Sequence, residues 1–449
     1  MNDVRGQRVS VIGAARSGIG VAGLLRQQGA AVFVSDQQPA EKLKIQLAEL
    51  DADGVAYETG GHTERVYACS LMVISPGVPS DAPVVIEATR RQIRIVSELE
   101  VSSWYSPARM IAVTGSNGKT TTTTLIGRMM ADVRRPHVVA GNIGTAFASV
   151  VASLTPEDLA VLEVSSFQLD HIEQFKPWIS VLLNITEDHM DRYGYSMERY
   201  AASKARVFAN QGTDDVLVYN ADDPWTARVV SGARCRKLPF STHQRLNEGA
   251  FVEGKELVTI LNRNRAVIVP VEEVSLKGMH NLSNTMAAVL VGQLAGIGRA
   301  SLRATLRNFK GVEHRLEFVR DVDGVRYVND SKATNVDSVW YALQSFREPI
   351  VLLLGGRDKG NDYSRLIEPV REHVKAIIAV GESSGKVRDA FASTVPVTIA
   401  TTMEDAVRQA SNAATRGDVV LLSPACASFD WFENYEHRGR VFKELVHQL

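Results

Sequence analysis

The chain contains very little cysteine: Cys69, Cys235 and Cys426 are the only three in 449 residues, and they lie far apart. This spacing matches neither a disulfide framework nor the paired cysteines of a zinc site. No uninterrupted apolar stretch approaches the roughly 18 residues that a membrane helix needs. The segment 1–8 is polar and lacks the pattern of a signal peptide. We therefore expect a cytoplasmic protein with no membrane partner.

An excess of charge of either sign is also missing. Fifty Lys and Arg residues against 51 Asp and Glu residues give a formal net charge of −1. A global basic field for nucleic acid is thereby excluded. The 45% hydrophobic and 22% charged composition is typical of globular proteins, so a disordered or fibrous chain is excluded too. At about 150 residues per domain, the length predicts three domains, and the composition suits an enzyme.

Apolar runs of strand length alternate with segments of helical periodicity along most of the chain. Continuous Val, Ile and Leu runs indicate strands buried on both faces, and helices between them indicate parallel, doubly wound sheets. We expect strands at 8–13, 31–36, 71–75, 93–97, 109–115, 159–165, 178–186, 350–356, 376–381 and 418–423. The region 232–275 has short β segments punctuated by glycine, which predicts an antiparallel patch on the central domain.

The fold class predicted is therefore α/β with three domains. A Rossmann-like N-terminal domain spans 1–98, and a central domain with the parallel sheet of P-loop ATPases spans 99–311. A Rossmann-like C-terminal domain spans 312–449. The break near Ser102–Pro107 and the one near Asn308–Glu313 support these divisions.

The strongest local motif is the segment 110–124, MIAVTGSNGKTTTTT. An apolar strand ends at Gly115-Ser116-Asn117-Gly118-Lys119-Thr120, and a helix-compatible segment follows. Backbone N–H groups of a glycine loop, a helix N-terminus and a lysine together form a polyphosphate cradle, in which the Thr120 hydroxyl is placed for Mg²⁺. The usual first glycine is replaced by Val113, so the loop is a shorter variant. A simple Gly/Ser turn with a solvated lysine is the alternative.

The N-terminal loop, Gly13 to Gly18, is a weak dinucleotide signature because it lacks the middle glycine that lies against a pyrophosphate. Nicotinamide binding is therefore disfavoured, and a Rossmann-like domain for another nucleotide is favoured. Asp36, at the end of the second strand, is suited to a ribose or another polar group. Ser75 and Gly77 follow a later strand and are expected to face the same crevice.

After the phosphate loop, two strands end in residues that could bind a metal ion. Glu163 lies near the end of a buried strand, where a carboxylate is costly without a cation. Mg²⁺ is the expected partner, and a core Arg or Lys is the alternative. The next strand ends in Glu187-Asp188-His189-Met190-Asp191. His189 is either a second metal ligand or a plain loop histidine.

Lys204 lies on one helical stripe with Tyr200, Val207 and Phe208. A lysine on a buried stripe often extends its head to water, and the spacing alone favours this interpretation. Its position near the edge that carries the metal residues suggests the functional alternative.

The last third contains several further polar segments at strand ends. His280-Asn281 opens a helix, and His314-Arg315 follows the second domain break. Segment 327–335 (YVNDSKATN) closes a strand and opens a helix, for which Asp330 and Ser331 are reasonable N-caps. An N-cap role does not explain Lys332, because a cation there opposes the helix dipole. Segments 355–360 (GGRDKG) and 423–430 (SPACASFD) also follow strands.

Together these segments resemble the Mur ligase family over nearly the whole chain, in the same order. TGSNGKTTT is similar to the family's variant phosphate loop, and GNIG (141–144), EVSSFQ (163–168), DHMD (188–191) and His280-Asn281 are similar to its central-domain blocks. Within the family, DSKATN and SPACASFD resemble the member that adds D-glutamate. Sister ligases typically carry Ala-His or Asn-Ala pairs after the aspartate.

The resemblance implies a role for each matching residue. Lys119, Glu163, His189 and Lys204 are implied as catalytic, with Thr120, Glu163, His189 and Lys204 holding two Mg²⁺ ions and Lys204 carbamylated. Contacts to ATP are implied for Gly115, Ser116, Asn117, Gly118, Lys119, Thr120, Thr121, Asn281, Arg315 and Asp330. Contacts to the UDP-linked substrate are implied for Arg16, Ser17, Asp36, Asn142, Ser165 and Gln168, joined by Ser75 and Gly77. Contacts to D-glutamate are implied for Lys332, Thr334, Lys359, Ser428 and Phe429.

The implied reaction is the ATP-dependent addition of D-glutamate to UDP-N-acetylmuramoyl-L-alanine in peptidoglycan precursor synthesis, by a monomer. ATP phosphorylates the substrate carboxylate, and the amine of D-glutamate attacks the acyl phosphate. The rivals are a sister Mur enzyme or folylpolyglutamate synthetase, a non-catalytic nucleotide switch, and an NAD-dependent dehydrogenase. DSKATN and the N-terminal domain disfavour the first, and a second metal site disfavours the switch.

Overall fold

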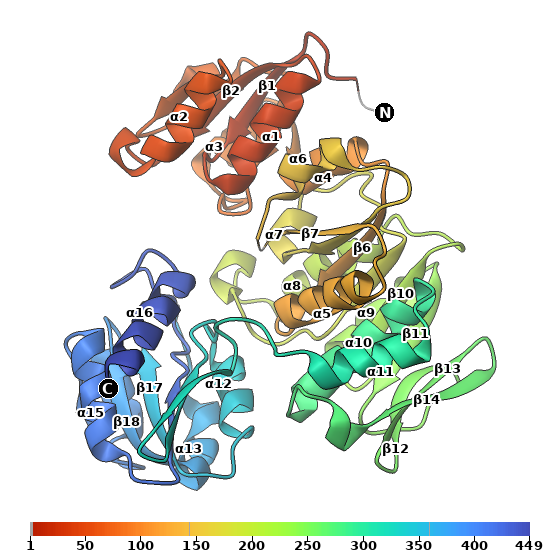
Figure 1. Cartoon of the computed structure of the whole chain (residues 1–449). Coiled ribbons are helices and arrows are strands. Elements are labelled where there is room, and N and C mark those ends of the chain that lie inside the picture. The colour runs from red at the N-terminus through yellow and green to blue at the C-terminus, as the bar shows by residue number, and fades with distance from the viewer. Residues whose placement is uncertain (1–2, 143, 359) are drawn as a thin grey trace. The chain divides into compact units, whose positions relative to one another are not determined.

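The computed structural model describes residues 3–142, 144–358 and 360–449. Its three sheets are distributed over two compact units (Figure 1). The first unit comprises residues 1–185, 192–274 and 283–308, and the second comprises 186–191, 275–282 and 309–449. In the part of the chain that is described, no helix is long and apolar enough to cross a membrane.

The N-terminal sheet has five parallel strands in the order β3-β2-β1-β4-β5. Ligands of such sheets bind outside the carboxyl ends of the strands, where the order reverses, here between β1 and β4. The strands are β1 (Arg8–Ile12), β2 (Ala31–Asp36), β3 (Ala56–Thr59), β4 (Leu71–Ile74) and β5 (Arg94–Ser97), with helices α1 (Arg16–Gln27), α2 (Lys44–Ala52), α3 (Pro83–Arg90) and α4 (Glu98–Trp104).

The central sheet has nine strands in the order β14-β13-β12-β11-β10-β9-β6-β8-β7. It is parallel from β7 to β12, whereas β12, β13 and β14 pair antiparallel. The strands are β6 (Arg109–Thr114), β7 (His137–Gly141), β8 (Leu159–Glu163), β9 (Ile179–Leu182), β10 (Val216–Asn220), β11 (Arg236–Ser241), β12 (Gly249–Glu253), β13 (Glu256–Leu261) and β14 (Asn264–Pro270). The helices between and after them are α5 (Lys119–Asp132), α6 (Phe147–Val150), α7 (Ser166–Leu169), α8 (Met197–Ala205), α9 (Pro224–Val229), α10 (Met279–Leu294) and α11 (Arg299–Asn308).

The C-terminal sheet has six strands in the order β15-β16-β20-β17-β18-β19, all parallel except the β15–β16 hairpin. Helices α12 to α14 pack on one face, and α15 and α16 pack on the other (Figure 1). The strands are β15 (Glu317–Val322), β16 (Val325–Asn329), β17 (Ile350–Gly355), β18 (Val374–Val380), β19 (Val397–Ile399) and β20 (Val419–Leu422). The helices are α12 (Val336–Leu343), α13 (Ile367–His373), α14 (Ser384–Phe391), α15 (Met403–Ala413) and α16 (Tyr435–Gln448).

The α/β prediction with parallel-sheet domains is confirmed, and each of the ten expected strands is present within a few residues. The antiparallel patch is confirmed as β12 to β14. The boundaries after residues 98 and 311 stay a prediction, supported by the fact that the strands of each sheet fall within one expected range. The N-cap expectation for Asp330 and Ser331 is wrong. Helix α12 begins five residues later, where the Asn335 side chain accepts from the Ser338 N–H.

Candidate active site

The phosphate loop connects the central strand β6 to helix α5. Strand β6 lies between β8 and β9, so residues at the carboxyl ends of these neighbours flank the loop. Asn184, just beyond β9, accepts from the Asn117 N–H through its side chain (2.8 Å) and from the Ser116 N–H through its carbonyl (2.9 Å). The Ser116 hydroxyl also lies 3.2 Å from the Tyr200 hydroxyl. The loop is therefore held in shape by β9 and α8, as a phosphate cradle requires.

Gly118 is the N-cap of α5 and adopts a left-handed conformation, with φ at +82°. A Cβ atom there would lie 2.2 Å from the Asn284 side-chain oxygen, on α10. Glycine is needed on both counts, for backbone conformation and for space. The motif alone did not reveal that Asn284 packs against this glycine. Asn284 is 4% exposed and lies directly against the loop that is expected to bind phosphate.

The two lysines of this region both turn toward the loop backbone. Lys119 Nζ donates to the carbonyls of Gly115 and Ser116, at 2.7 Å each. Lys204 Nζ donates to Gly115 at 2.9 Å and lies 4.5 Å from the centre of the Tyr200 ring. Since Lys204 is 1% exposed, its head does not reach water, and the interpretation favoured from helical spacing is wrong. The expected stripe is confirmed, because Tyr200, Val207 and Phe208 are buried with it.

Glu163 ends β8 and is 2% exposed. Its Oε1 accepts from the Asn142 side-chain amide at 3.1 Å, and Asn142 N–H donates to the Glu163 carbonyl at 2.9 Å. Its Oε2 has no hydrogen-bond partner among the residues that the structure describes. The alternative of an Arg or Lys partner is thus wrong for this oxygen. A buried carboxylate oxygen of this kind fits a cation.

Ser165 and Gln168 form a capping box at the start of α7. Gln168 Oε1 accepts from the Ser165 N–H at 2.9 Å and from its hydroxyl at 3.1 Å. Gln168 Nε2 donates to Glu98 Oε1 at 2.7 Å. The fully buried Glu98, on α4, was not found from the sequence.

The N-terminal loop lies at the reversal point of the first sheet. Asp36 Oδ2 accepts from the Ala14 N–H at 2.5 Å, and the Ser75 hydroxyl donates to the Gly13 carbonyl at 3.1 Å. The exposed Arg16 begins α1, with Ser17 next to it, and donates to the Gly144 carbonyl. Asp36 and Ser75 are therefore brought to one edge with this loop, and the carbonyl of the exposed Gly77 accepts from Arg192 at 3.1 Å.

Thr120 and Thr121 are buried in the first turn of α5. The other expected residues belong to the second unit, including His189, whose φ is +54°. His189 Nε2 lies 3.6 Å from an oxygen of Asp188. The same Asp188 oxygen, Oδ2, accepts from the Asn335 side-chain amide at 3.1 Å. Asn335 thereby links the DHMD segment to the N-terminus of α12.

Arg315 and Asp330 are neighbours in the second unit. Asp330 is 2% exposed, and its oxygens accept from the Leu316 N–H (3.2 Å) and the Ser423 hydroxyl (2.9 Å). Burial raises the pKa of Asp330 to about 6, and the nearby Arg315 charge partly opposes this. Arg315 Nε is buried and has no hydrogen-bond partner in the described part of the chain. Asn281, on α10, donates to the Lys277 carbonyl at 2.8 Å.

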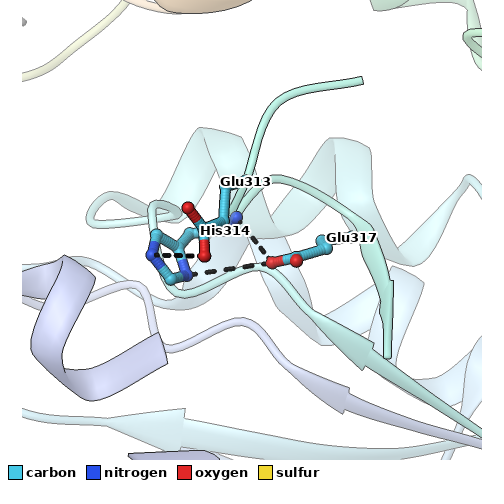
Figure 2. A group of neighbouring side chains, drawn as sticks. All are labelled: Glu313, His314 and Glu317. Atoms are coloured by element: carbon cyan, nitrogen blue, oxygen red, sulfur yellow. Dashed lines mark hydrogen bonds and ion pairs between the residues drawn. The ribbon is translucent and has the colours of Figure 1, made fainter. Parts of the chain in front are cut away.

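Next to Arg315, the side chains of Glu313, His314 and Glu317 converge (Figure 2). Their candidate ligand atoms all lie within 4.8 Å of one another. Lys443 Nζ already lies between the two carboxylates, 2.9 Å from Glu313 and 2.7 Å from Glu317. Burial lowers the pKa of His314, which keeps its ring neutral at physiological pH. We interpret this cluster as an ion-paired brace for the segment that carries Arg315.

The three C-terminal loops meet because β16, β20 and β17 are adjacent. Arg438 joins two of them and was not found from the sequence. It is 2% exposed and donates to Ser331 Oγ (2.9 Å), Ser331 O (2.8 Å) and Cys426 O (3.1 Å). Burial lowers the pKa of Arg438 to about 10.

The expected glutamate-pocket residues sit on these loops. Lys332 Nζ contacts the Tyr435 hydroxyl at 3.1 Å, and Thr334 N–H donates to the Lys332 carbonyl at 2.9 Å. Ser428 is buried, whereas Phe429 is 61% exposed. Lys359 lies outside the residues that the structure describes.

A phosphate-type loop on a doubly wound sheet, with a Rossmann-like sheet before it and another after it in the sequence, defines a multidomain nucleotide-binding class of α/β protein. Family models match in three successive segments: the MurD N-terminal domain at 8–84, the Mur ligase middle domain at 113–292 and the Mur ligase, glutamate ligase domain at 314–426. A UDP-N-acetylmuramoylalanine–D-glutamate ligase of Salinibacter ruber is 46% identical over 100% of this chain and 99% of that protein. The protein of the same name from Koribacter versatilis is 44% identical, over 100% and 98%. The chain belongs to the Mur ligase family.

Solved structures share the fold at low identity. The UDP-N-acetylmuramate-alanine ligase of Thermotoga maritima is 18% identical, with a TM-score of 0.62 over 98% of this chain and 99% of that one. A pseudomurein peptide ligase type C of Methanothermus fervidus is 17% identical, with a TM-score of 0.62 over 99% and 100%. The three-domain Mur ligase architecture is thereby confirmed for this chain.

Proposed function

We propose that the chain is an ATP-dependent ligase that joins D-glutamate to UDP-N-acetylmuramoyl-L-alanine in peptidoglycan precursor synthesis. The observation that carries the proposal is identity of 46% and 44%, over the whole chain, with two proteins named for that activity. The DSKATN and SPACASFD loops resemble those of the D-glutamate-adding member. They follow the adjacent strands β16 and β20 and are joined by Arg438, so they can contribute to one amino-acid pocket.

The reaction proceeds by activation of a carboxylate. The terminal alanine carboxylate attacks the γ-phosphorus of ATP, the bond to the β-phosphate oxygen breaks, and ADP leaves. The amine of D-glutamate then attacks the acyl carbon to give a tetrahedral intermediate, which loses a proton from nitrogen and expels phosphate. A free carboxylate has a poor leaving group, so this phosphorylation is what makes amide formation feasible. Catalysis depends mainly on positioning and charge neutralisation.

The phosphate loop holds the polyphosphate in this proposal. The N-terminus of α5, which begins at Lys119, faces the negative charge, and Lys119 exchanges its contacts with Gly115 and Ser116 for phosphate oxygens. The fixed shape of the loop, held by Asn184 and Tyr200, lowers the cost of organising it around ATP.

The residues present also fit magnesium. Glu163 Oε2 is buried without a partner among the described residues. Thr120 is the second residue of α5, the helix that follows β6, and β6 neighbours the strand β8 that ends at Glu163. We propose these two for one ion, and His189 with Lys204, carried as a carbamate, for a second. Bound Mg²⁺ neutralises charge on the transferred phosphoryl group. Asn142 holds Glu163 through the other oxygen, Oε1, at 3.1 Å.

The second unit supplies the remaining contacts. Arg315, Asp330 and Asn281 are proposed for the nucleotide, and the buried Arg315 Nε without an acceptor in the described chain supports this. The proposed D-glutamate contacts are Lys332, Thr334, Lys359, Ser428 and Phe429. Two lysines suit an amino acid with two carboxylates.

The UDP-linked substrate is assigned to the first unit. Its proposed contacts are Arg16, Ser17, Asp36, Ser75, Gly77, Asn142, Ser165 and Gln168. We further propose a cytoplasmic monomer with no nucleic-acid or membrane partner, which agrees with the net charge of −1. Light scattering at micromolar concentration tests the monomer directly.

Phosphate release tests the proposed function. The protein is mixed with ATP, Mg²⁺ and UDP-N-acetylmuramoyl-L-alanine, and D-Glu, L-Glu, L-Ala, meso-diaminopimelate and L-Lys are offered in parallel. Release with D-Glu alone is expected. Release with another amino acid would retain the mechanism and overturn the assignment of the C-terminal loops. ATP binding without release in any mixture would indicate a nucleotide switch.

A further inference from the structure

Glu98 is a buried carboxyl at the carboxyl end of β5, the first residue of α4. It is 4% exposed, and its Oε1 accepts from Gln168 Nε2 at 2.7 Å. These two residues are 70 positions apart in sequence. The contact therefore joins the carboxyl edge of the N-terminal sheet to the carboxyl edge of the central sheet, within the first unit.

The Gln168 side chain has one orientation as a result. Its oxygen accepts from the N–H and the hydroxyl of Ser165, so its nitrogen must face Glu98. Gln168 is 2% exposed, which leaves little freedom to turn. Removing Glu98 would leave a buried amide donor without its acceptor and would release the constraint on Ser165.

Other hydrogen bonds hold the junction between α4 and the segment 171–175, so Glu98 is not needed for it. Glu100, two residues further along α4, accepts from the backbone N–H groups of Glu173, Gln174 and Phe175 at 2.8–2.9 Å. Ser97 N–H also donates to the His171 carbonyl at 2.8 Å. These bonds secure the segment 171–175, whereas Glu98 acts on the loop end, at Gln168 and Ser165.

A carboxyl group is also a costly way to fill this position. Burial raises the pKa of Glu98 to about 7. The hydrogen bond from Gln168 lowers the pKa and so offsets part of this effect. Its Oε2 is buried and has no hydrogen-bond partner within the described ranges. A packing role alone would be served better by an apolar side chain, so the geometry favours a role in orienting Gln168.

We propose that Glu98 is a positioning residue for the UDP-linked substrate, which acts by holding Gln168 and Ser165 in the conformation that receives the muramoyl end. The proposal rests on the proposed function. Glu98 itself touches no reacting atom in this scheme. It fixes the loop that follows Glu163 before the substrate arrives, so its loss affects substrate affinity more than nucleotide affinity.

The test compares Glu98→Ala, Glu98→Gln and the control Glu173→Gln in the full-length protein. Glu173 lies at the same junction but is exposed and pairs with Arg94. Calorimetry with UDP-N-acetylmuramoyl-L-alanine is expected to show at least tenfold weaker binding for Glu98→Ala. Glu98→Gln keeps an acceptor oxygen for Gln168 Nε2 and is expected within threefold of wild type, as is Glu173→Gln. A non-hydrolysable ATP analogue is expected to bind all four proteins within twofold.

Hydrogen exchange provides an independent measurement. The Ser165 and Gln168 amides are expected to exchange at least tenfold faster in Glu98→Ala and at the wild-type rate in Glu98→Gln. Should Glu98→Ala not fold, Glu98→Asp, whose shorter side chain withdraws the acceptor, replaces it in both measurements. Wild-type affinity and exchange in the alanine or aspartate variant would overturn the proposal, as would equal losses for both ligands. A wild-type protein that does not bind the UDP substrate would refute the proposed function, while accelerated exchange at 165–168 would still show Glu98 positioning this loop.

Discussion

The ammonium groups of Lys119 and Lys204 donate to the same backbone oxygen, that of Gly115, at 2.7 and 2.9 Å. One lysine comes from the first turn of α5 and the other from α8, 85 residues later in the chain. Both side chains are therefore anchored to the loop that we propose to hold polyphosphate. Lys119 keeps its positive charge for the phosphates, whereas the carbamate proposed for Lys204 would replace its ammonium group, and with it the bond to Gly115, by metal-binding oxygens.

The first prediction concerns Lys119. In Lys119→Ala, the charge at the phosphate loop is lost while the N-terminal sheet is untouched. We expect D-glutamate-dependent phosphate release to fall at least about 1,000-fold, because a cation that neutralises charge on the transferred phosphoryl group typically contributes a factor of this size. Binding of UDP-N-acetylmuramoyl-L-alanine, measured by calorimetry, is expected to change less than twofold. Turnover near the wild-type rate would refute the phosphate-loop assignment.

Lys204 gives a second prediction, with a matched control. Lys204→Met keeps most of the buried volume but removes the bond to Gly115 and the contact with the Tyr200 ring. We expect kcat to fall about 100-fold or more, with a thermal midpoint that drops by only a few degrees. The exposed Lys237 serves as control, since Lys237→Met leaves both quantities unchanged. A normal kcat in Lys204→Met would rule out its proposed role at the second metal.

Arg438 is the basis of the third prediction. Its buried guanidinium bonds Ser331 and Cys426, so it fixes two of the loops proposed to bind D-glutamate. Lysine cannot reproduce this fork of donors. We expect Arg438→Lys to raise KM for D-glutamate at least tenfold and KM for ATP much less, in steady-state assays. Arg440→Lys, an exposed change on the same helix, is the control. Equal changes in both KM values would indicate general destabilisation.

The sequence predicted most buried strands, but among the edge strands of the parallel sheets it predicted only β5. Strands such as β17 are continuous apolar runs because helices cover both faces, and this pattern needs no partner to be recognised. Strands β3, β7, β15 and β19 lie at the edges of their sheets and bury few side chains, so they carry weak patterns and were not expected. The buried strand β10 has a clear apolar run and could have been found.

The candidate site shows the same division between local and distant information. The phosphate loop was recognised because strand, glycines, lysine and helix are contiguous in sequence. Glu98, Asn284 and Arg438 were missed because their partners are far away. Glu98 bonds a residue 70 positions later and Arg438 bonds one 107 positions earlier. Polar residues on amphipathic helices give no sign of such contacts until the sheets are assembled.

The fourth prediction concerns backbone conformation at Gly118. Gly118→Ala would place a Cβ 2.2 Å from Asn284 Oδ1 and impose a left-handed φ on alanine. We expect a loss of about 1 kcal/mol or more in stability and at least a tenfold rise in KM for ATP. Gly232→Ala is the control, because an added Cβ there meets nothing within 4 Å. Unchanged KM for ATP in Gly118→Ala would contradict a tight loop at this position.

The last prediction concerns pH and Glu98. Its pKa rises from 4.5 to about 7 on folding because it is buried. Between these values the folded chain keeps a proton that the unfolded chain has lost, so stability contributed at this site falls as pH rises from 4.5 to 7. The full penalty above that range is on the order of 3 kcal/mol, from about 1.4 kcal/mol per pKa unit. Glu98→Gln removes this penalty. Its thermal midpoint, relative to wild type, is therefore expected to increase by several degrees between pH 5 and pH 8 in calorimetric scans. A difference between the two proteins that stays constant over this range would show that Glu98 titrates alike in the folded and unfolded chains.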